Sequence, residues 1–232
     1  MRIAIADDEE TIREFMASLL NDGGHKCSVF RDGRDVMNAM MRDTFDLVII
    51  DWMMPSVNGL EILRWARANL SPCPPIIMLT SRSDKADVAE ALNAGADDYI
   101  IKPESKNVIL ARVEAVMRRT THQPEKHSRV EEFGRYSFDR MTNNVLLDGE
   151  EIVLTAREFA LARLFFLNPN RAFSRAYILE TLWNSVPDLP TRTLDMHISR
   201  IRSKLRLAPE NGYRLQTIFG HGYRLEVFDQ EE

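Results

Sequence analysis

The sequence is poor in cysteine and has no long apolar run. Its two cysteines, Cys27 and Cys73, are too few for a disulfide framework, which fits a reducing cytoplasm. No apolar stretch approaches the ~20 residues that span a bilayer, and the apolar run at the N-terminus is too short for a signal peptide. The five histidines show no metal-ligand spacing with cysteine, so we expect no zinc site. We therefore expect a cytoplasmic protein without membrane attachment.

The chain also lacks a strong charge of one sign. Its net charge is −5, which is not typical of a nucleic-acid-binding protein. The distribution is more informative, because residues 191–206 carry five basic side chains and a single acidic one, Asp195. A local basic stripe matters more for binding than the sum over the chain. With 232 residues, 44% of them hydrophobic, the chain is long enough for two ordinary packed domains.

The first half of the chain alternates between strand-like and helix-like patterns. This alternation predicts a parallel sheet with helices on both faces. We therefore expect an α/β domain over residues 1–120 with a doubly wound, five-stranded parallel sheet. The patterns predict strands at 2–6, 26–30, 46–50, 75–79 and 98–101, and helices at 9–21, 33–42, 58–69, 84–94 and 105–119.

Polar and charged residues stand where these apolar runs stop. Asp7 and Asp8 follow the first run, Asp51 the third, Thr80 the fourth and Lys102 the fifth. The carboxyl ends of parallel strands border one crevice, so these groups are expected to converge. Crowded carboxylates repel one another unless a cation joins them, and a hard ion such as Mg²⁺ suits a few carboxylates, waters and a phosphate. A carboxylate can also act as a nucleophile and form an aspartyl phosphate.

Asp51 is the best candidate for that nucleophile. It ends the most apolar run, and Pro55 and Gly59 follow four and eight residues later. In this order the motifs resemble the CheY-like, flavodoxin-like receiver domain of two-component response regulators. The resemblance implies that a sensor histidine kinase phosphorylates Asp51. It also implies direct Mg²⁺ contacts from Asp8, Asp51 and the Met53 carbonyl, a water-mediated contact from Asp7, phosphoryl contacts from Thr80 and Lys102, and a switch role for Tyr99.

Two alternatives compete with this interpretation. Asp7 and Asp8 precede an amphipathic helical pattern, so alone they could merely favour the N-terminus of that helix. A phosphohydrolase with an aspartate nucleophile would carry a D-x-D pattern, but position 53 here is Met. General acid–base help is therefore missing, and we do not expect an enzyme. The resemblance to receiver domains also implies that Trp52, Met53 and Arg82 flank the site at positions that affect access and dephosphorylation.

The second half is set apart by a polar stretch with a proline, residues 121–131, which has the composition of a flexible linker. Short strands are expected after it, at 133–138, 144–147 and 151–154. Asp148-Gly149, between the last two, is a strong hairpin signal.

Helix signals follow these strands. Thr155 and Glu158 form a capping-box pattern, Ser174 caps a second helix and Thr191 opens a third. The chain is expected to close with a hairpin whose turn contains glycine, over residues 213–225. Three helices followed by a hairpin make a winged helix, in which a later helix enters the major groove of DNA.

Residues 132–228 resemble the winged-helix DNA-binding domain of OmpR/PhoB-type response regulators, through spaced motifs at 154–159, 192–205 and 220–225. In the third helix an apolar stripe repeats at intervals of four, three and four, and is expected to be buried: Leu194, Ile198, Ile201 and Leu205. The resemblance implies base contacts from Thr193, Asp195 and Arg200, and phosphate contacts from Arg192, His197, Arg202 and Lys204. Taken alone, this helix would favour a solvated charged face, and it is the surrounding motifs that favour DNA contacts.

The wing departs from the family pattern at one position. Many members carry Arg before the turn glycine, reaching into the minor groove, where this chain has Phe219. A phenylalanine cannot neutralise phosphate or exploit a narrow A·T groove electrostatically. We expect minor-groove readout to be weakened or replaced by apolar contact.

The resemblance also implies how the two halves are coupled. Phosphorylation would bias a surface made by the fourth helix, fifth strand and fifth helix toward a homodimer, with Asp98 and Arg112 as an ion pair. Val88 and Val108 stand where charged partners are frequent, either as an apolar contact or as plain helix surface. A dimer would place two DNA-binding domains on direct repeats of promoter DNA, raising avidity ~10²–10⁴-fold. By analogy, the loop 184–190 could touch RNA polymerase. The alternative is a regulator that binds DNA without phosphate.

Overall fold

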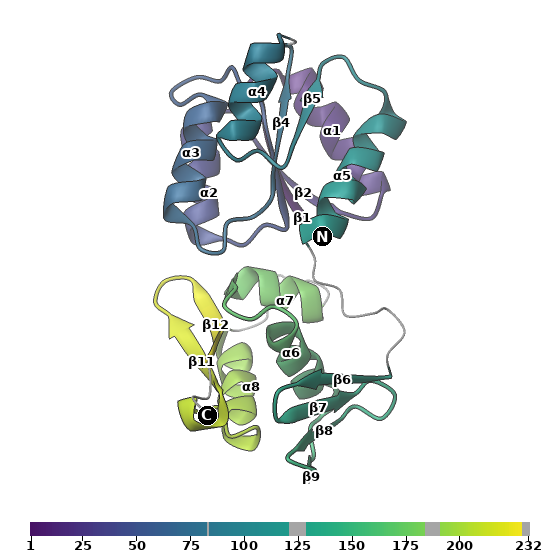
Figure 1. The fold of residues 1–232 in the computed structure, drawn as a ribbon, viewed down its shortest axis with the longest axis vertical. Coiled ribbons are helices and arrows are strands. Elements are labelled where there is room, and N and C mark those ends of the chain that lie inside the picture. The colour runs from purple at the N-terminus through teal and green to yellow at the C-terminus, as the bar shows by residue number, and fades with distance from the viewer. Residues whose placement is uncertain (83, 121–128, 184–190, 229–232) are drawn as a thin grey trace. The chain divides into compact units, whose positions relative to one another are not determined.

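The computed structural model of the chain describes residues 1–82, 84–120, 129–183 and 191–228 (Figure 1). The chain divides into two compact units, Met1–His122 and Gln123–Glu232. The first unit has two hydrophobic cores and the second has one. Residues 121–128 of the expected linker and the whole loop 184–190 lie outside the described residues.

The N-terminal unit alternates strands and helices, as the sequence predicts. Its strands form one five-stranded parallel sheet in the order β2-β1-β3-β4-β5. The expected doubly wound fold is thereby confirmed. The elements are β1 (Arg2–Ala6), α1 (Glu10–Asp22), β2 (Lys26–Phe30), α2 (Gly33–Arg42), β3 (Leu47–Ile50), α3 (Gly59–Asn69), β4 (Ile76–Thr80), α4 (Lys85–Asn93), β5 (Asp98–Ile101) and α5 (Lys106–Thr120).

The sheet is covered on both faces because its central strands are apolar throughout. Every residue of β3 and β4 is buried, and successive side chains enter opposite cores. Helices α1 and α5 cover one face of the sheet, and α2, α3 and α4 cover the other (Figure 1). Ile49 packs in the first of these cores and Ile50 in the second. The strand order reverses between β1 and β3, so a crevice is expected beyond the carboxyl ends of these two strands.

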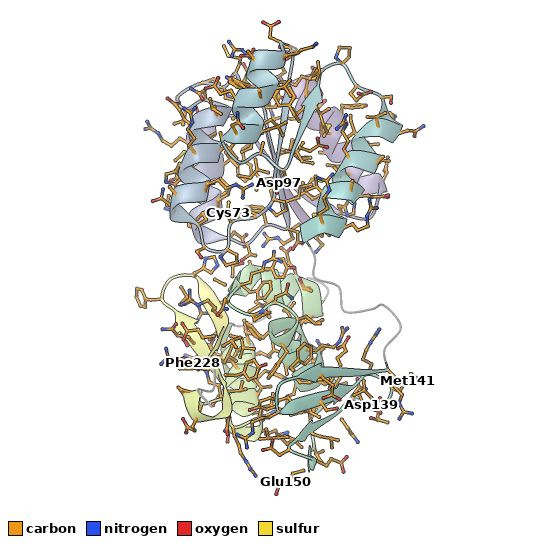
Figure 2. The ribbon with its side chains drawn as sticks, in the orientation of Figure 1. Cys73, Asp97, Asp139, Met141, Glu150 and Phe228 are labelled. Carbon is orange, nitrogen blue, oxygen red and sulfur yellow. The ribbon has the colours of Figure 1, made fainter. Side chains whose placement is uncertain are left out.

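The C-terminal unit begins with a four-stranded antiparallel sheet in the order β6-β7-β8-β9. The expected single strand at 133–138 is wrong, because Gly134, with φ of 56°, turns the chain between β6 and β7. The hairpin expected at Asp148-Gly149 is confirmed, with φ of 51° and 86°. Met141 and Glu150 lie at two margins of this sheet (Figure 2). The strands are β6 (Val130–Phe133), β7 (Tyr136–Asp139), β8 (Asn144–Leu147) and β9 (Glu150–Ile152).

Three helices and a second sheet complete the C-terminal unit. The second sheet has the order β10-β12-β11, and its β11–β12 hairpin is the wing. In Figure 1 the turn of this hairpin and the four-stranded sheet lie at opposite sides of the unit. This arrangement confirms the expected winged helix. The elements are α6 (Ala156–Phe166), β10 (Ala172–Ser174), α7 (Arg175–Trp183), α8 (Thr191–Lys204), the 3₁₀ turn η1 (Pro209–Asn211), β11 (Tyr213–Ile218) and β12 (Gly222–Val227).

Local signals in the helices behave as expected. The Thr155 hydroxyl accepts the N–H of Glu158, and the Glu158 carboxylate accepts the N–H of Thr155 at 2.8 Å, so the capping box at α6 is confirmed. The predicted stripe of α8 is at most 1% exposed: Leu194, Ile198, Ile201 and Leu205. Within the described ranges, no helix combines the length and apolar character that crossing a membrane requires.

Candidate functional site

Three carboxylates meet where β1 and β3 end. Asp7 and Asp8 follow β1 and Asp51 follows β3, and their ligand atoms lie within 4.8 Å of one another. Asp7 is fully buried and Asp51 is 5% exposed, whereas Asp8 faces solvent. The main chain holds them there, because the Asp51 N–H donates to the Ala6 carbonyl at 2.8 Å. Arg13 of α1 donates to the carbonyls of Asp7 and Asp8, at 2.8 Å each.

Lys102 is the cation that faces these acids. It follows β5, and its Nζ lies 2.5 Å from Asp7 Oδ2 and 3.1 Å from Asp51 Oδ1. Burial acts to lower the pKa of Lys102, but the two carboxylates outweigh it and the pKa is raised. The side chain therefore stays protonated. Three acids and one ammonium leave an excess of negative charge that a divalent cation would balance.

The Asp51 side chain is held so that one carboxylate oxygen, Oδ1, faces the ammonium of Lys102. Its other oxygen, Oδ2, accepts the N–H of Met53 at 2.9 Å. Burial, the largest cause, raises the pKa of Asp51, and Lys102 opposes the shift. A carboxylate in a dry setting, with its lone pairs oriented, is suited to nucleophilic attack on phosphorus.

Position 59, eight residues after Asp51, has no space for a side chain. A Cβ built at Gly59 would lie 2.2 Å from the main-chain oxygen of Asp51. The first turn of α3 therefore packs directly on the backbone of the acid. The Gly59 N–H donates to the Trp52 carbonyl at 2.9 Å and fixes the loop that carries Asp51.

Thr80, Arg82 and Tyr99 form a connected group beside the acids. Thr80 is fully buried at the end of β4, and its hydroxyl accepts the N–H of Arg82 at 3.3 Å. The Tyr99 hydroxyl donates to the Arg82 carbonyl at 2.8 Å, and Tyr99 is only 6% exposed. The aromatic ring thus lies inward. The guanidinium of Arg82 lies 5.0 Å from the centre of the Trp52 ring and pairs with Asp87 at 3.2 Å.

Helix α8 divides its polar side chains between solvent and the rest of its unit. Arg192 and Arg200 are exposed and Thr193 is half-buried. The other polar positions have partners inside the unit. His197 Nδ1 lies 2.8 Å from the Thr193 carbonyl oxygen, Arg202 donates to the Leu215 carbonyl at 2.7 Å, Lys204 pairs with Glu158 at 2.8 Å, and Asp195 accepts a hydrogen bond from the Tyr223 hydroxyl.

The positions expected at a dimer surface lie on α4, β5 and α5. Asp98 and Arg112 pair within the chain at 2.9 Å. Val88 is partly buried and packs on the core beneath α2, α3 and α4. Val108 is 36% exposed.

Two family models match the chain. The response regulator receiver domain matches residues 3–114, and the C-terminal domain of transcriptional regulatory proteins matches residues 149–225. The transcriptional regulatory protein SrrA of Staphylococcus aureus is 33% identical over 236 residues, covering 99% of this chain and 97% of SrrA. The chain belongs to the OmpR/PhoB-type two-component response regulators.

Solved structures are similar along the same regions. The response regulator DrrB of Thermotoga maritima, an OmpR/PhoB homologue, is 30% identical, with 97% of this chain and 98% of DrrB covered and a TM-score of 0.47. The receiver domain of the Francisella response regulator 1452 is 29% identical, with 51% of this chain and 98% of that domain covered and a TM-score of 0.49.

Membership in this family makes the chain a DNA-binding transcriptional response regulator of a two-component system. The receiver domain implies a histidine kinase as phosphodonor, and the C-terminal domain implies DNA as ligand. The acidic cluster of the receiver domain is compatible with Mg²⁺. Arg13, which holds the acidic loop, was not predicted from the sequence, because one arginine on an amphipathic helix has no pattern that separates it from a solvated one.

Proposed function

We propose that Asp51 is the phosphoacceptor and that its phosphorylation controls DNA binding. The observation that carries this proposal is the position of the Asp51 carboxylate, 3.1 Å from Lys102 and within 4.8 Å of Asp7 and Asp8. An Asp51 oxygen attacks the phosphorus of a kinase phosphohistidine, the phosphorus–nitrogen bond breaks, and the imidazole nitrogen leaves with the electron pair. The product is an aspartyl phosphate. The chain itself is a substrate and switch in this account and not an enzyme.

Lys102 and Thr80 receive the transferred group. The phosphoryl group brings about −1.5 to −2 charges and strong acceptor oxygens. Lys102 already faces Asp51, so its ammonium can move from Asp7 to a phosphoryl oxygen over a short distance. The hydroxyl of Thr80 is the nearby neutral donor that we assign to a second oxygen. When Thr80 moves toward the phosphoryl group, the hydrogen bond from the Tyr99 hydroxyl to the Arg82 carbonyl stabilises the new position of the segment that follows β4.

Mg²⁺ is the cofactor that fits the acids best. All the candidate ligands are oxygens, and the few carboxylates leave positions for water and phosphate, as this ion prefers. We assign direct contacts to Asp8, Asp51 and the Met53 carbonyl, and a contact through water to Asp7. When bound, the ion would offset the charge that builds up on the phosphoryl oxygens.

The signal passes from a receiver domain, residues 1–120, through a linker, residues 121–131, to the DNA-binding domain, residues 132–228. Phosphorylation promotes a homodimer through α4, β5 and α5, with Asp98, Arg112, Val88 and Val108 in its interface. Asp98 and Arg112 form an ion pair within one chain, so in the dimer they must exchange it for ion pairs between the two subunits. In the cytoplasm, the dimer then binds direct repeats in promoter DNA. Residues 184–190 are our candidate contact for RNA polymerase.

The side chains expected to contact DNA form two groups: those exposed to solvent and those with hydrogen-bond partners inside their own unit. Arg192 and Arg200 are exposed, so we assign Arg192 to phosphate and Arg200, with Thr193, to base edges. Four other residues expected to touch DNA already have partners inside the unit, so any DNA contact must be made while keeping or exchanging them: Asp195, His197, Arg202 and Lys204.

One observation favours a second candidate, a regulator that dimerises and binds DNA without phosphate. Tyr99 already lies inward and bonds to Arg82. If the inward position of Tyr99 belongs to the DNA-binding conformation, phosphorylation of Asp51 is not needed to reach that conformation.

Sedimentation of the full chain with Mg²⁺, with and without beryllofluoride, separates the two candidates. We expect beryllofluoride to convert wild-type monomers to dimers, to leave Asp51→Asn monomeric, and to act normally on Asp35→Asn, which removes an exposed acid of α2. Dimers under every condition would favour the phosphate-independent regulator. Monomers under every condition would contradict both.

A further inference from the structure

The tip of the wing carries one bare aromatic ring. Phe219 is 101% exposed, more than any other large apolar side chain of the described residues. It begins a tight turn in which the His221 N–H donates to the Ile218 carbonyl at 3.1 Å and Gly220 has φ of 71°. One exposed apolar residue is ordinary on a protein surface. The place of Phe219 in the unit is therefore what makes it informative.

Side chains of α8 fix both strands of the wing. Arg202 donates to the Leu215 carbonyl at 2.7 Å and to the Thr217 hydroxyl at 2.9 Å, both on β11. On β12, the Tyr223 hydroxyl donates to Asp195. The wing and α8 are thus joined as one piece, and the position of Phe219 relative to α8 is set.

The base of the turn is also fixed, on the side of α7. The Arg175 N–H donates to the His221 carbonyl at 3.1 Å. A Cβ at Gly222 would lie 2.0 Å from the Phe173 carbonyl oxygen, so the backbones of β12 and β10 are in direct contact. The base of the turn is therefore held in place, and no described residue of its own unit covers the ring of Phe219.

DNA is the occupant that this geometry favours. If α8 enters a major groove, as the proposed function requires, the wing bonded to α8 lies beside that groove. We place the tip of the wing at the neighbouring minor groove. The exposed Arg192 and Arg200 stand on α8, the helix to which the wing is bonded through Asp195 and Arg202. A benzyl group cannot pair with phosphate, so it gains most from the apolar faces of bases.

We infer that Phe219 is a wedge that enters the minor groove and partly unstacks one base step. Apolar wedges of this kind, phenylalanine among them, bend the duplex toward the major groove. Pyrimidine–purine steps such as TA and CA unstack most easily, so the wedge would favour them at the wing position without any hydrogen bond to a base. The chain would then read one step through the deformability of DNA. This inference rests on the proposed function.

The wedge has a thermodynamic signature that separates it from a phosphate contact. Aromatic contacts with bases are lost on substitution by alanine at a cost of about 5- to 100-fold in affinity. An apolar contact releases no counterion, so Phe219→Ala should leave the slope of log affinity against log salt unchanged. Phe219→Arg should steepen that slope by about one phosphate contact without unstacking the step.

The experiment uses the full chain with Mg²⁺ and beryllofluoride, and duplexes selected from a random pool by the wild-type chain. Permanganate oxidation reports unstacked thymines, and energy transfer between dyes at the duplex ends reports bending. Phe219→Ala, Phe219→Leu and Phe219→Arg are compared with wild type, and Arg200→Ala is the control that should weaken binding without abolishing thymine reactivity in the DNA that remains bound.

We expect one reactive thymine step in the wild-type complex, retained in part by Phe219→Leu and lost in Phe219→Ala and Phe219→Arg, together with the bend. Wild-type binding without a reactive thymine or a bend, or a bend that survives Phe219→Ala, would overturn the wedge while leaving the proposed function intact. A change in dimer mass caused by Phe219→Ala in the absence of DNA would assign the ring to a second copy of the chain and would also overturn it. If wild type selects no DNA, the proposed function itself fails.

Discussion

The ammonium of Lys102 lies 3.1 Å from Oδ1 of Asp51, across the carboxyl ends of β3 and β5. This contact joins the candidate nucleophile to the only lysine that pairs with it among the described residues. Burial, the largest cause, raises the pKa of Asp51, and the contact with Lys102 opposes that rise.

Lys102→Met should slow phosphorylation of Asp51 strongly. Without its cation, the buried Asp51 carboxylate loses the charge partner that opposes desolvation, and the incoming phosphoryl oxygens lose a donor. The rate of phosphoryl incorporation from a small-molecule phosphodonor measures the effect. Lys106→Met, which changes an exposed lysine of α5, should react like wild type. Equal rates in all three proteins would show that Lys102 is not part of the site.

Arg82→Ala should shorten the lifetime of the aspartyl phosphate. The guanidinium covers Trp52, which is 5% exposed and next to Asp51 in the sequence, so its removal opens one side of the crevice to water. A lost cation–π contact corresponds to about a 2- to 5-fold change in rate. Loss of phosphate is followed after the phosphodonor is removed. Arg64→Ala removes a similar surface pair, with Glu90 at 3.0 Å, and should change nothing. An unaltered or longer lifetime in Arg82→Ala would contradict this role.

Tyr223→Phe should loosen the wing. The change removes the hydroxyl that donates to Asp195, and the net loss is about 1 kcal/mol of folding free energy for the C-terminal unit. DNA affinity should fall as well, because β12 loses its side-chain bond to α8 and only the bonds of Arg202 to β11 remain. Thermal unfolding and DNA titration measure the two effects. Tyr213→Phe keeps a partly buried ring and removes a hydroxyl with no hydrogen bond among the described residues, so it should be nearly neutral. Equal losses from both substitutions would argue against the Tyr223–Asp195 bond.

The C-terminal unit should lose stability at high pH through Tyr136. Burial, the main cause, raises the pKa of Tyr136 to about 12, and its hydroxyl donates to the Leu205 carbonyl at 2.7 Å. In the unfolded chain the pKa is ordinary, about 10. The unfolded state therefore ionises first, and stability falls as pH rises from about 10 to about 12, by roughly 2–3 kcal/mol.

Denaturant unfolding across this pH range, with Tyr136→Phe for comparison, tests the assignment. The variant starts less stable because the bond to Leu205 is absent, but its stability should fall less steeply with pH. Identical slopes for wild type and variant would assign the alkaline transition to other groups.

The sequence predicted the receiver fold and the place of its site for a simple physical reason. β1, β3 and β5 end in apolar residues that are followed by polar ones, and the carboxyl ends of parallel strands share one edge. Local patterns were therefore sufficient to bring Asp7, Asp51 and Lys102 together. The split between β6 and β7 was missed because Gly134 stands inside a run that alternates like one strand. A single glycine is a weak signal for a turn there.

Long-range partners of charged side chains could not be predicted. Lys204 looks like a phosphate-binding residue along α8, yet it pairs with Glu158, which is 46 residues away. Asp195 accepts a hydrogen bond from Tyr223, 28 residues away. Periodicity shows which face of a helix is buried, but not which distant strand or helix covers its polar edge.

The central claim is that one oxygen of Asp51 becomes phosphorylated and that this event changes which surfaces bind. The direct measurement treats the full chain with Mg²⁺ and a small-molecule phosphodonor, traps acyl phosphate with borohydride, and maps the modified residue by mass spectrometry. Borohydride expels the phosphate and leaves homoserine, so the account predicts one reduced residue per chain, at position 51, and none in Asp51→Asn. An unmodified wild-type chain, or a phosphoryl group carried at another residue, would contradict it.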